Sequence, residues 1–164
     1  MGAARIVDAT PEDAPALLRL VAELAAFEGL AATVTIDEER LARDLAGPAP
    51  RCRAKLAFEG DDAVGYATFG EVYFSFTGPW VYLDDLYVRE DRRSRGLGRA
   101  LLAAVSRAAL DAGCHGMAWT VLHDNTPAQR FYEGLGARLA REWWPVRVEG
   151  PAALRAFAAR LEGA

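Results

Sequence analysis

The feature that most constrains the fold is a glycine-rich loop placed between an apolar strand and an amphipathic helix. The run from Trp80 to Val88 is rich in β-branched and aromatic residues, which favours a central strand. A charged turn and Arg93-x-x-Gly96-x-Gly98 follow, and apolar residues then recur at helical spacing up to Gly113. Such a loop aims backbone N–H groups and the positive end of the helix dipole at one point. The sequence therefore predicts an anion site at the start of this helix.

The residues of the loop favour a diphosphate as the anion. Gly96 and Gly98 lack a Cβ, so an anion can come within hydrogen-bonding distance of the backbone. The chain has a net charge of -4, yet basic side chains gather at this loop: Arg92, Arg93, Arg95 and Arg99. The alternative is a glycine turn beside a solvated run of charge. The competing pattern G-x-x-x-x-G-K-[ST] is missing from the sequence, and G-x-G-x-x-G is missing at this loop.

The rest of the chain alternates between strand and helix patterns, without linkers or repeats. Further strands are expected at residues 5–9, 53–59, 63–72, 116–121 and 142–149, the last interrupted by Pro145. Further helices are expected at residues 10–28, 37–45, 126–135 and 151–161. Gly136 is expected to be the left-handed cap of the third of these helices. One mixed α/β domain over residues 1–164 accounts for this order.

Composition and charge exclude several classes of protein. With 52% hydrophobic and 26% charged residues, the chain is typical of globular proteins. Its acidic balance argues against nucleic-acid binding and suits a cationic small molecule. No apolar stretch approaches the roughly 18 residues that span a bilayer, and the N-terminus has no signal-peptide pattern. Because Cys52, Cys114, His115 and His123 fit no ligand pattern, we expect no metal, and reduced thiols in a cytoplasmic protein.

A second pattern lies about thirty residues beyond the loop and reads Asn125-x-Pro127-Ala128-x-x-Phe131-Tyr132-x-x-x-Gly136-Ala137. The strand, the R-x-x-G-x-G loop and the helix resemble the coenzyme A motif of the GNAT acetyltransferases, and the second pattern is similar to their second cofactor motif. The likeness covers almost the whole chain. Residues 23–28, 82–85 and 93–98 most closely resemble the spermidine/spermine and thialysine acetyltransferase branch. The resemblance implies a single-domain α/β GNAT fold, with a mixed, mostly antiparallel central sheet flanked by helices on both faces.

The resemblance also implies an N-acetyltransferase that takes acetyl-coenzyme A as its co-substrate. In the family, the strand before the loop splays from its neighbour, and its exposed amides pair with the pantetheine arm. A backbone N–H near Leu86 is then a candidate donor to the oxyanion. The residues that the resemblance assigns to the cofactor are Leu86, Tyr87, Val88, Arg93, Ser94, Arg95, Gly96, Leu97, Gly98, Arg99 and Asn125.

Acetyl transfer to an amine needs two proton transfers, one from the attacking ammonium group and one to the leaving thiolate. A lysine-like amine has a pKa near 10.4, so only about one molecule in a thousand is neutral at pH 7, a cost of ~4 kcal/mol. Asp84 is the candidate base, acting through water. Because the branch usually has glutamate at that position, the alternative is that Asp84 holds the ammonium group. Tyr132 matches the family's catalytic tyrosine and is the expected proton donor to the leaving thiolate, the alternative being a tyrosine that only fills core space.

The acceptor amine is expected to contact Phe27, Glu28, Asp84 and Asp85, again by resemblance to the polyamine-acetylating branch. Carboxylates recognise ammonium groups, and an aromatic ring adds cation–π attraction. Glu28 is alternatively an ordinary solvated acid at a helix end. Neighbours on a strand point to opposite faces, so either Asp84 or Asp85 is expected to face the core or a cleft. A carboxylate buried there needs a cationic or hydrogen-bonding partner.

The sequence therefore predicts direct attack on the thioester by a primary amine of a small cationic acceptor, which is a polyamine, a diamine or a lysine-like amine. Other acceptors stay open: an amino acid, an aminoglycoside or a protein amine. A coenzyme A-binding sensor without catalysis is the alternative from another class, and the aspartate at position 84 is its main support. The resemblance also implies a homodimer, in which residues 142–149 are exchanged as a strand between subunits.

Overall fold

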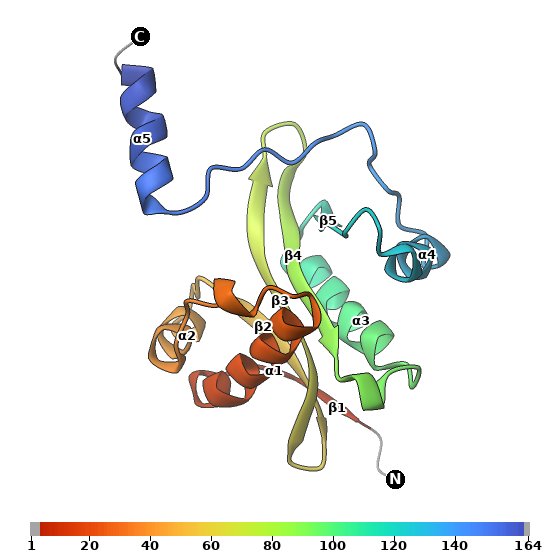
Figure 1. The fold of residues 1–164 in the computed structure, drawn as a ribbon. Coiled ribbons are helices and arrows are strands. Elements are labelled where there is room, and N and C mark those ends of the chain that lie inside the picture. The colour runs from red at the N-terminus through yellow and green to blue at the C-terminus, as the bar shows by residue number, and fades with distance from the viewer. Residues whose placement is uncertain (1–3, 163–164) are drawn as a thin grey trace. The chain divides into compact units, whose positions relative to one another are not determined.

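A computed structural model of the chain describes residues 4–162, which form an open five-stranded sheet with helices on both of its faces (Figure 1). The chain divides after Thr120 into two units. The sheet and the helices α1, α2 and α3 lie in the first unit, and α4 and α5 lie in the second. The prediction of an α/β fold with a mixed sheet is confirmed.

The strands run in chain order across the sheet, and the first four are antiparallel to their neighbours. Their bounds are β1 Arg5–Asp8, β2 Arg53–Glu59, β3 Asp62–Phe74, β4 Gly78–Val88 and β5 Gly116–Ala118. β5 is parallel to β4, and such a pair needs a crossover connection, which α3 supplies. The glycine loop thus lies at the point where the chain leaves β4 to make this crossover.

The helices begin and end close to the residues that their capping signals predict. They are α1 Ala14–Phe27, α2 Glu38–Leu45, α3 Leu97–Asp111, α4 Thr126–Gly134 and α5 Pro151–Glu162, with short 3-10 helices at Pro11–Asp13, Ala31–Thr33 and Glu90–Arg92. The Thr10 N–H donates to Asp13 Oδ2 at 2.8 Å, and Asp37 Oδ1 accepts from the Arg40 N–H at 2.7 Å, so side chains satisfy the first free backbone donors. Within the described residues, no helix has the length and apolar character needed to cross a membrane.

The two faces of the sheet are covered by different helices. On one face, Leu17 and Leu20 of α1 pack with Leu56 and Tyr66, all four fully buried. Gly65 lies on the opposite face because side chains alternate along a strand, and a Cβ built there would come within 3.3 Å of Leu101 of α3. Each fully buried leucine contributes about 1.5–3 kcal/mol by leaving water. The core therefore has an α1 face and an α3 face, and the site residues of the first unit divide between them and the edges of the sheet.

Two predictions about strands need correction. β5 ends at Ala118 instead of residue 121. Residues 142–149 form no strand, so that prediction is wrong. A strand needs a neighbour to satisfy its backbone, Pro145 lacks an N–H, and no strand occurs among the described residues of the second unit. The apolar residues Trp143, Trp144 and Val146 are instead largely exposed, at 75%, 88% and 92%.

Gly65 and Gly70 of β3 make a matched pair for testing the packing of the sheet. A Cβ at Gly65 would lie 2.8 Å from the Tyr87 carbonyl oxygen, which is backbone and cannot rotate away. At Gly70 it would meet nothing within 4 Å. We expect Gly65→Ala to lower the free energy of unfolding by about 1–3 kcal/mol and Gly70→Ala to change it by less than about 0.5 kcal/mol, as measured by urea denaturation. Equal effects of the two substitutions would contradict the described packing of β3 against β4.

Candidate active site

A β-bulge in β4 positions the carboxylates of the site. Thr68 pairs with Asp85 and Phe69 pairs with Leu83, so Asp84 has no partner on β3. Paired residues share a face of the sheet, and Thr68 and Phe69, as neighbours, lie on opposite faces. Leu83 and Asp85 would share a face in a regular strand, but the extra residue places Asp85 on the α1 face and leaves Leu83 on the α3 face.

Asp85 is half-buried on the α1 face and is held by hydrogen bonds. The hydroxyl group of the fully buried Tyr66 donates to Asp85 Oδ2 at 3.0 Å, and the Asp85 N–H donates to Thr68 Oγ1 at 3.2 Å. Burial raises the pKa of Asp85, nearby Asp84 and Glu28 raise it further, and the hydrogen bond from Tyr66 opposes them. Burial and Asp85 also hold the pKa of Tyr66 well above its usual range, so Tyr66 stays a donor. Tyr66 therefore supplies the hydrogen bond that a carboxylate in this position needs.

The charged side chains that shift the pKa of Asp85 near the bulge are both acidic. Glu28 and Asp84 lie close enough to affect the pKa of Asp85. Burial, together with Asp84, Asp44 and Asp85, raises the pKa of the Cys52 thiol to about 11. Over residues 4–162, no Lys or Arg forms an ion pair with Glu28, Asp84 or Asp85. These three residues, called here the carboxylate cluster, favour a cationic ligand.

Among residues 4–162, no strand pairs with the outer edge of β4 beyond Tyr82. β5 pairs with β4 only as far as Tyr82. The Arg89 N–H donates to the Val64 carbonyl oxygen of β3 at 3.0 Å, which sets the alternation of backbone groups along the antiparallel pair. By this alternation, Leu86 and Val88 point their N–H and C=O groups away from β3, toward the edge that β5 leaves free. This free edge of β4 can accept an extended ligand as a further strand would be accepted.

Tyr87 lies between Leu86 and Val88, and it is buried instead of facing the free edge. Its N–H and C=O groups point at β3, by the same alternation. Its ring is buried beside that of Tyr66, with centroids 6.1 Å apart, and its hydroxyl group donates to Glu23 Oε2 at 3.3 Å. The side chain of Tyr87 therefore joins β4 to α1.

The glycine loop contains two residues with left-handed backbone conformation. Ser94 and Gly96 have φ values of 62° and 82°, in the left-handed region that glycine adopts without strain. The first N–H donated within α3 is that of Ala100, to the Gly96 carbonyl oxygen at 2.9 Å. The N–H groups of Leu97–Arg99 therefore lack a helical acceptor and are available to an anion.

Side-chain space at the loop is also open where an anion would approach. A Cβ on Gly96 or Gly98 would meet nothing within 4 Å. Leu97 is buried, so it offers a ligand only its backbone. The residues of the loop thus fit a phosphate group held by backbone N–H groups.

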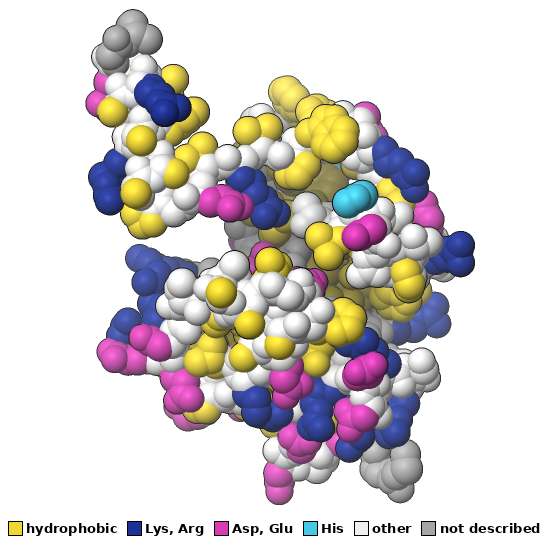
Figure 2. All heavy atoms as spheres, viewed as in Figure 1, with side chains coloured by type: hydrophobic (Ala, Val, Ile, Leu, Met, Phe, Trp, Pro, Cys, Tyr) yellow, Lys and Arg dark blue, Asp and Glu magenta, His cyan; other side chains and the backbone are white. Residues whose placement is uncertain are grey.

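Part of the positive charge at the loop is neutralised inside the protein. Arg92 Nε lies 2.9 Å from Glu59 Oε2, and Arg92 Nη1 lies 2.5 Å from Asp91 Oδ2. Arg95 Nη1 is 4.0 Å from Glu59 Oε1. Figure 2 shows Lys and Arg side chains interleaved with Asp and Glu side chains over the lower part of the surface in that view. Arg99 has no acidic partner among the described residues. The ion pair of Arg92 with Glu59 thus links the loop to β2, while the positive charge of Arg99 stays available to a ligand.

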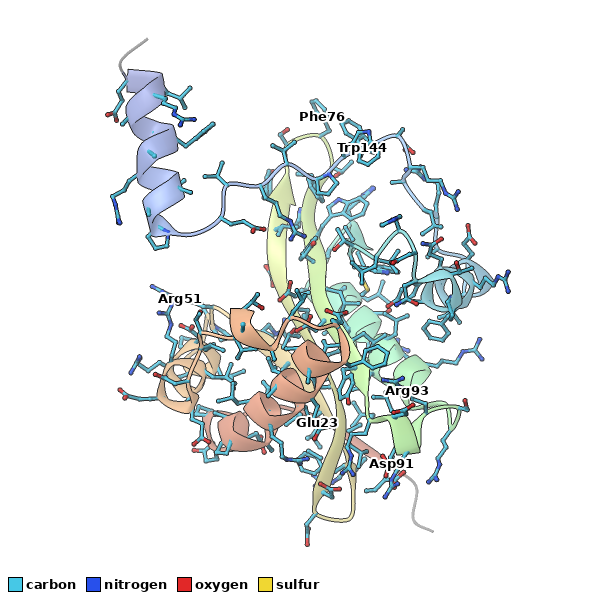
Figure 3. All side chains as sticks on the ribbon, viewed as in Figure 1. Glu23, Arg51, Phe76, Asp91, Arg93 and Trp144 are labelled. Atoms are coloured by element: carbon cyan, nitrogen blue, oxygen red, sulfur yellow. The ribbon has the colours of Figure 1, made fainter. Side chains whose placement is uncertain are left out.

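Arg93 lies between the end of α1 and the loop that leads into α3 (Figure 3). Its Nε donates to the Val88 carbonyl oxygen at 3.0 Å, on the free edge of β4. Its guanidinium carbon lies 4.6 Å from the ring centroid of Phe27 and 5.8 Å from that of Tyr87. The structure thus brings Phe27, expected beside the acceptor, against an arginine expected beside the cofactor.

The other predicted site residues, Asn125 and Tyr132, belong to the second unit. Asn125 caps α4, and its Oδ1 accepts from the Ala128 N–H at 3.2 Å. The Tyr132 ring lies 5.3 Å from that of Phe131, and burial raises the pKa of its hydroxyl group, which is therefore protonated at neutral pH. Gly136 has a φ of 91° just beyond the helix, which confirms its left-handed cap.

Several residues that shape the site carry no sequence signal of that role. Tyr66, Thr68 and Cys52 lie beside the carboxylate cluster, and Glu59 holds the loop arginines. Only the strand register brings them there, and two bulges shift that register. Among residues 4–162, no group of three or more His, Cys, Asp or Glu side chains is arranged to hold a metal ion.

The chain is similar to a known protein family, to named relatives and to a solved structure. A model of the acetyltransferase (GNAT) family matches residues 16–137. Thialysine N-epsilon-acetyltransferase of Mus musculus is 34% identical over 171 residues, which cover 98% of this chain and 100% of that protein. A human spermidine/spermine N(1)-acetyltransferase-like protein is 31% identical over 132 residues, or 76% of this chain and 19% of its own length. An integron cassette protein of V. cholerae has the same fold, with a TM-score of 0.77 and 24% identity over 96% of this chain and 99% of that one.

Asp85→Asn should change how stability depends on pH. Burial raises the pKa of Asp85 above its ordinary value of 3.8, so the folded protein binds this proton more tightly than the unfolded chain does. The stabilisation is complete below about pH 3.8 and is lost as the pH rises through the folded-state pKa. The free energy of unfolding of the wild type, minus that of Asp85→Asn, should therefore fall in urea denaturation as the pH rises above 3.8.

Asp61→Asn is the matched control, because Asp61 lies exposed in the turn between β2 and β3. It should show no such trend relative to the wild type. Parallel stability curves for the wild type and Asp85→Asn would show that Asp85 is not buried as described.

Proposed function

This chain belongs to the GNAT acetyltransferase family, and from that premise we propose that it acetylates a primary amine of a small cationic acceptor. The family membership and the named N-acetyltransferase relatives make it an acyltransferase with acetyl-coenzyme A as the donor. The acceptor class we propose is a polyamine, a diamine or a lysine-like amine. The observation that carries this proposal is the carboxylate cluster of Glu28, Asp84 and Asp85, which no basic side chain of the described residues neutralises.

Charge favours an acceptor with more than one ammonium group. The carboxylates near the bulge repel one another, which is one reason the pKa of Asp85 is raised. An ammonium group about 4 Å from one carboxylate gains about 4 kcal/mol near a protein surface, before the cost of desolvation is subtracted. A second ammonium group on the same molecule gains from the remaining carboxylates. The relatives named for thialysine and for spermidine/spermine agree with this class.

We propose that the glycine loop and the free edge of β4 hold the donor. The backbone N–H groups of Leu97–Arg99 suit its pyrophosphate, and so does the Arg99 side chain, which has no acidic partner within residues 4–162. The outward N–H and C=O groups of Leu86 and the outward N–H group of Val88 suit the amides of its pantetheine arm, as in the addition of a strand to a sheet. The Leu86 N–H is then the candidate donor to the thioester oxygen, where negative charge develops during attack.

Asp84 and Tyr132 take the proton transfers in this proposal. Asp84 is exposed at the bulge, where it can hold the ammonium group or remove its proton through a water molecule. The Tyr132 hydroxyl group donates a proton to the departing sulfur, and its raised pKa keeps it protonated until that step. Asn125 uses Oδ1 to cap α4, and its NH2 group is proposed to contact the donor.

We further propose that the protein is a cytoplasmic homodimer. The exposed apolar side chains of Trp143, Trp144 and Val146 support a partner surface in the second unit. Cys52 and Cys114 are both free thiols, as suits a reducing compartment.

The test of this function is release of coenzyme A thiol from acetyl-coenzyme A in the presence of polyamines, diamines, lysine analogues, aminoglycosides and neutral amino acids. We expect turnover with dications well above that with neutral amino acids. Donor binding by calorimetry without turnover on any amine would favour a sensor instead. Turnover confined to aminoglycosides would move the acceptor to another class.

Tyr132→Phe tests the proton donor. Because general acid catalysis contributes about 100-fold or more, kcat should fall by about that factor, while the KM for acetyl-coenzyme A stays within about 2-fold. Phe131→Leu, at the neighbouring ring, is the control for disturbance of α4 and should keep most of kcat. Unchanged turnover in Tyr132→Phe would remove Tyr132 from the mechanism.

A further inference from the structure

Phe27 ends α1 with its ring in an unusual place for a large apolar side chain. The side chain is 61% exposed, so it contributes little to the core. Its ring instead lies under the guanidinium group of Arg93, with 4.6 Å between the guanidinium carbon and the ring centroid. This distance is within the range of a cation–π interaction, which contributes about 0.5–1 kcal/mol at an exposed site. The contact therefore joins the end of α1 to the start of the glycine loop.

Arg93 is restrained from three directions although its side chain is exposed to solvent. Phe27 lies on one side, the Tyr87 ring lies 5.8 Å away, and the Nε–H group donates to the Val88 carbonyl oxygen at 3.0 Å. A free arginine side chain has about 2 kcal/mol of rotamer entropy to lose when it binds a ligand. Because these contacts hold Arg93 in one region beforehand, part of that cost is already met in the folded protein.

The position of Arg93 belongs to the donor side of the site. Its hydrogen bond ends on the free edge of β4, and its backbone opens the loop that leads to α3. The face of the Phe27 ring that meets Arg93 already holds a cation. A substrate ammonium group on that face would lie close to the guanidinium charge and would be repelled by it.

We infer that Phe27 is a positioning residue for the donor: its ring holds Arg93 in place for acetyl-coenzyme A, and it does not form a wall of the acceptor site. This inference rests on the proposed function of the glycine loop. The family resemblance assigns Phe27 to the acceptor amine, whereas this inference assigns it to the donor. Kinetics can therefore separate the two assignments. The KM for the donor should depend on Phe27, and the KM for the amine should not.

The experiment measures coenzyme A affinity by calorimetry, and both KM values, in Phe27→Ala, Phe27→Leu and Phe27→Tyr. Loss of 0.5–1 kcal/mol corresponds to weakening of about 2- to 5-fold. We expect Phe27→Ala and Phe27→Leu to weaken coenzyme A binding by that factor and to raise the donor KM, with the amine KM unchanged. Phe27→Tyr keeps the aromatic face and should restore wild-type affinity. Leu30→Ala, at an exposed apolar residue that follows α1, is the matched control and should bind coenzyme A normally.

A double-substitution cycle tests whether Phe27 acts through Arg93. In an Arg93→Ala background, Phe27→Ala should cause no further loss of coenzyme A affinity. The same loss in both backgrounds would overturn the inference, and so would a raised amine KM with normal coenzyme A binding in Phe27→Ala. A wild-type protein that does not bind coenzyme A would contradict the proposed function as well. Wild-type binding with no effect of Phe27→Ala would overturn the inference alone.

Discussion

The bulge at Asp84 is the constraint on which the site depends. In a regular β4, Asp85 would lie on the same face as Leu83, under α3 and away from Tyr66. The extra residue instead turns Asp85 toward α1, where Tyr66 and Thr68 satisfy it. It also leaves Asp84 without a partner on β3, so this side chain is exposed next to the half-buried Asp85. One inserted residue thereby gathers negative charge at a place in the sheet that would otherwise hold apolar side chains.

The early end of β5 has an equally local effect on the other edge of β4. β5 pairs with β4 only to Tyr82, and the chain leaves β4 at Val88 to enter the loop and α3. The outward N–H and C=O groups of Leu86, the outward N–H group of Val88 and the first N–H groups of α3 therefore have no backbone partner among the described residues, while the Val88 carbonyl oxygen accepts from Arg93. The carboxylate cluster comes from side chains of β4 and of the residue that follows α1, while these donors and acceptors belong to the backbone. A cationic acceptor and an anionic donor can thus be recognised by the same strand without competing for the same groups.

Much of this could be predicted from sequence because it depends on local patterns. β2 has the predicted bounds of Arg53–Glu59, and Gly136 has the expected left-handed conformation. The bulge could not be predicted, because alternation along β4 gives no sign of which residue is unpaired. Nor could the pairing of Arg92 with Glu59, 33 residues earlier in the chain, which removes part of the charge that the loop offers in sequence. The prediction of a strand at residues 142–149 is wrong because apolar residues form a strand only beside an available sheet edge.

Backbone hydrogen exchange tests most directly whether the free edge of β4 receives the donor, as we propose. Without ligand, the amide protons of Leu86 and Val88 should exchange faster than that of Tyr87, whose N–H pairs with β3. Addition of coenzyme A should slow exchange at Leu86 and Val88, with little change at Tyr87. Slow exchange at Leu86 and Val88 in the free protein, or no added protection when coenzyme A is bound, would contradict the claim.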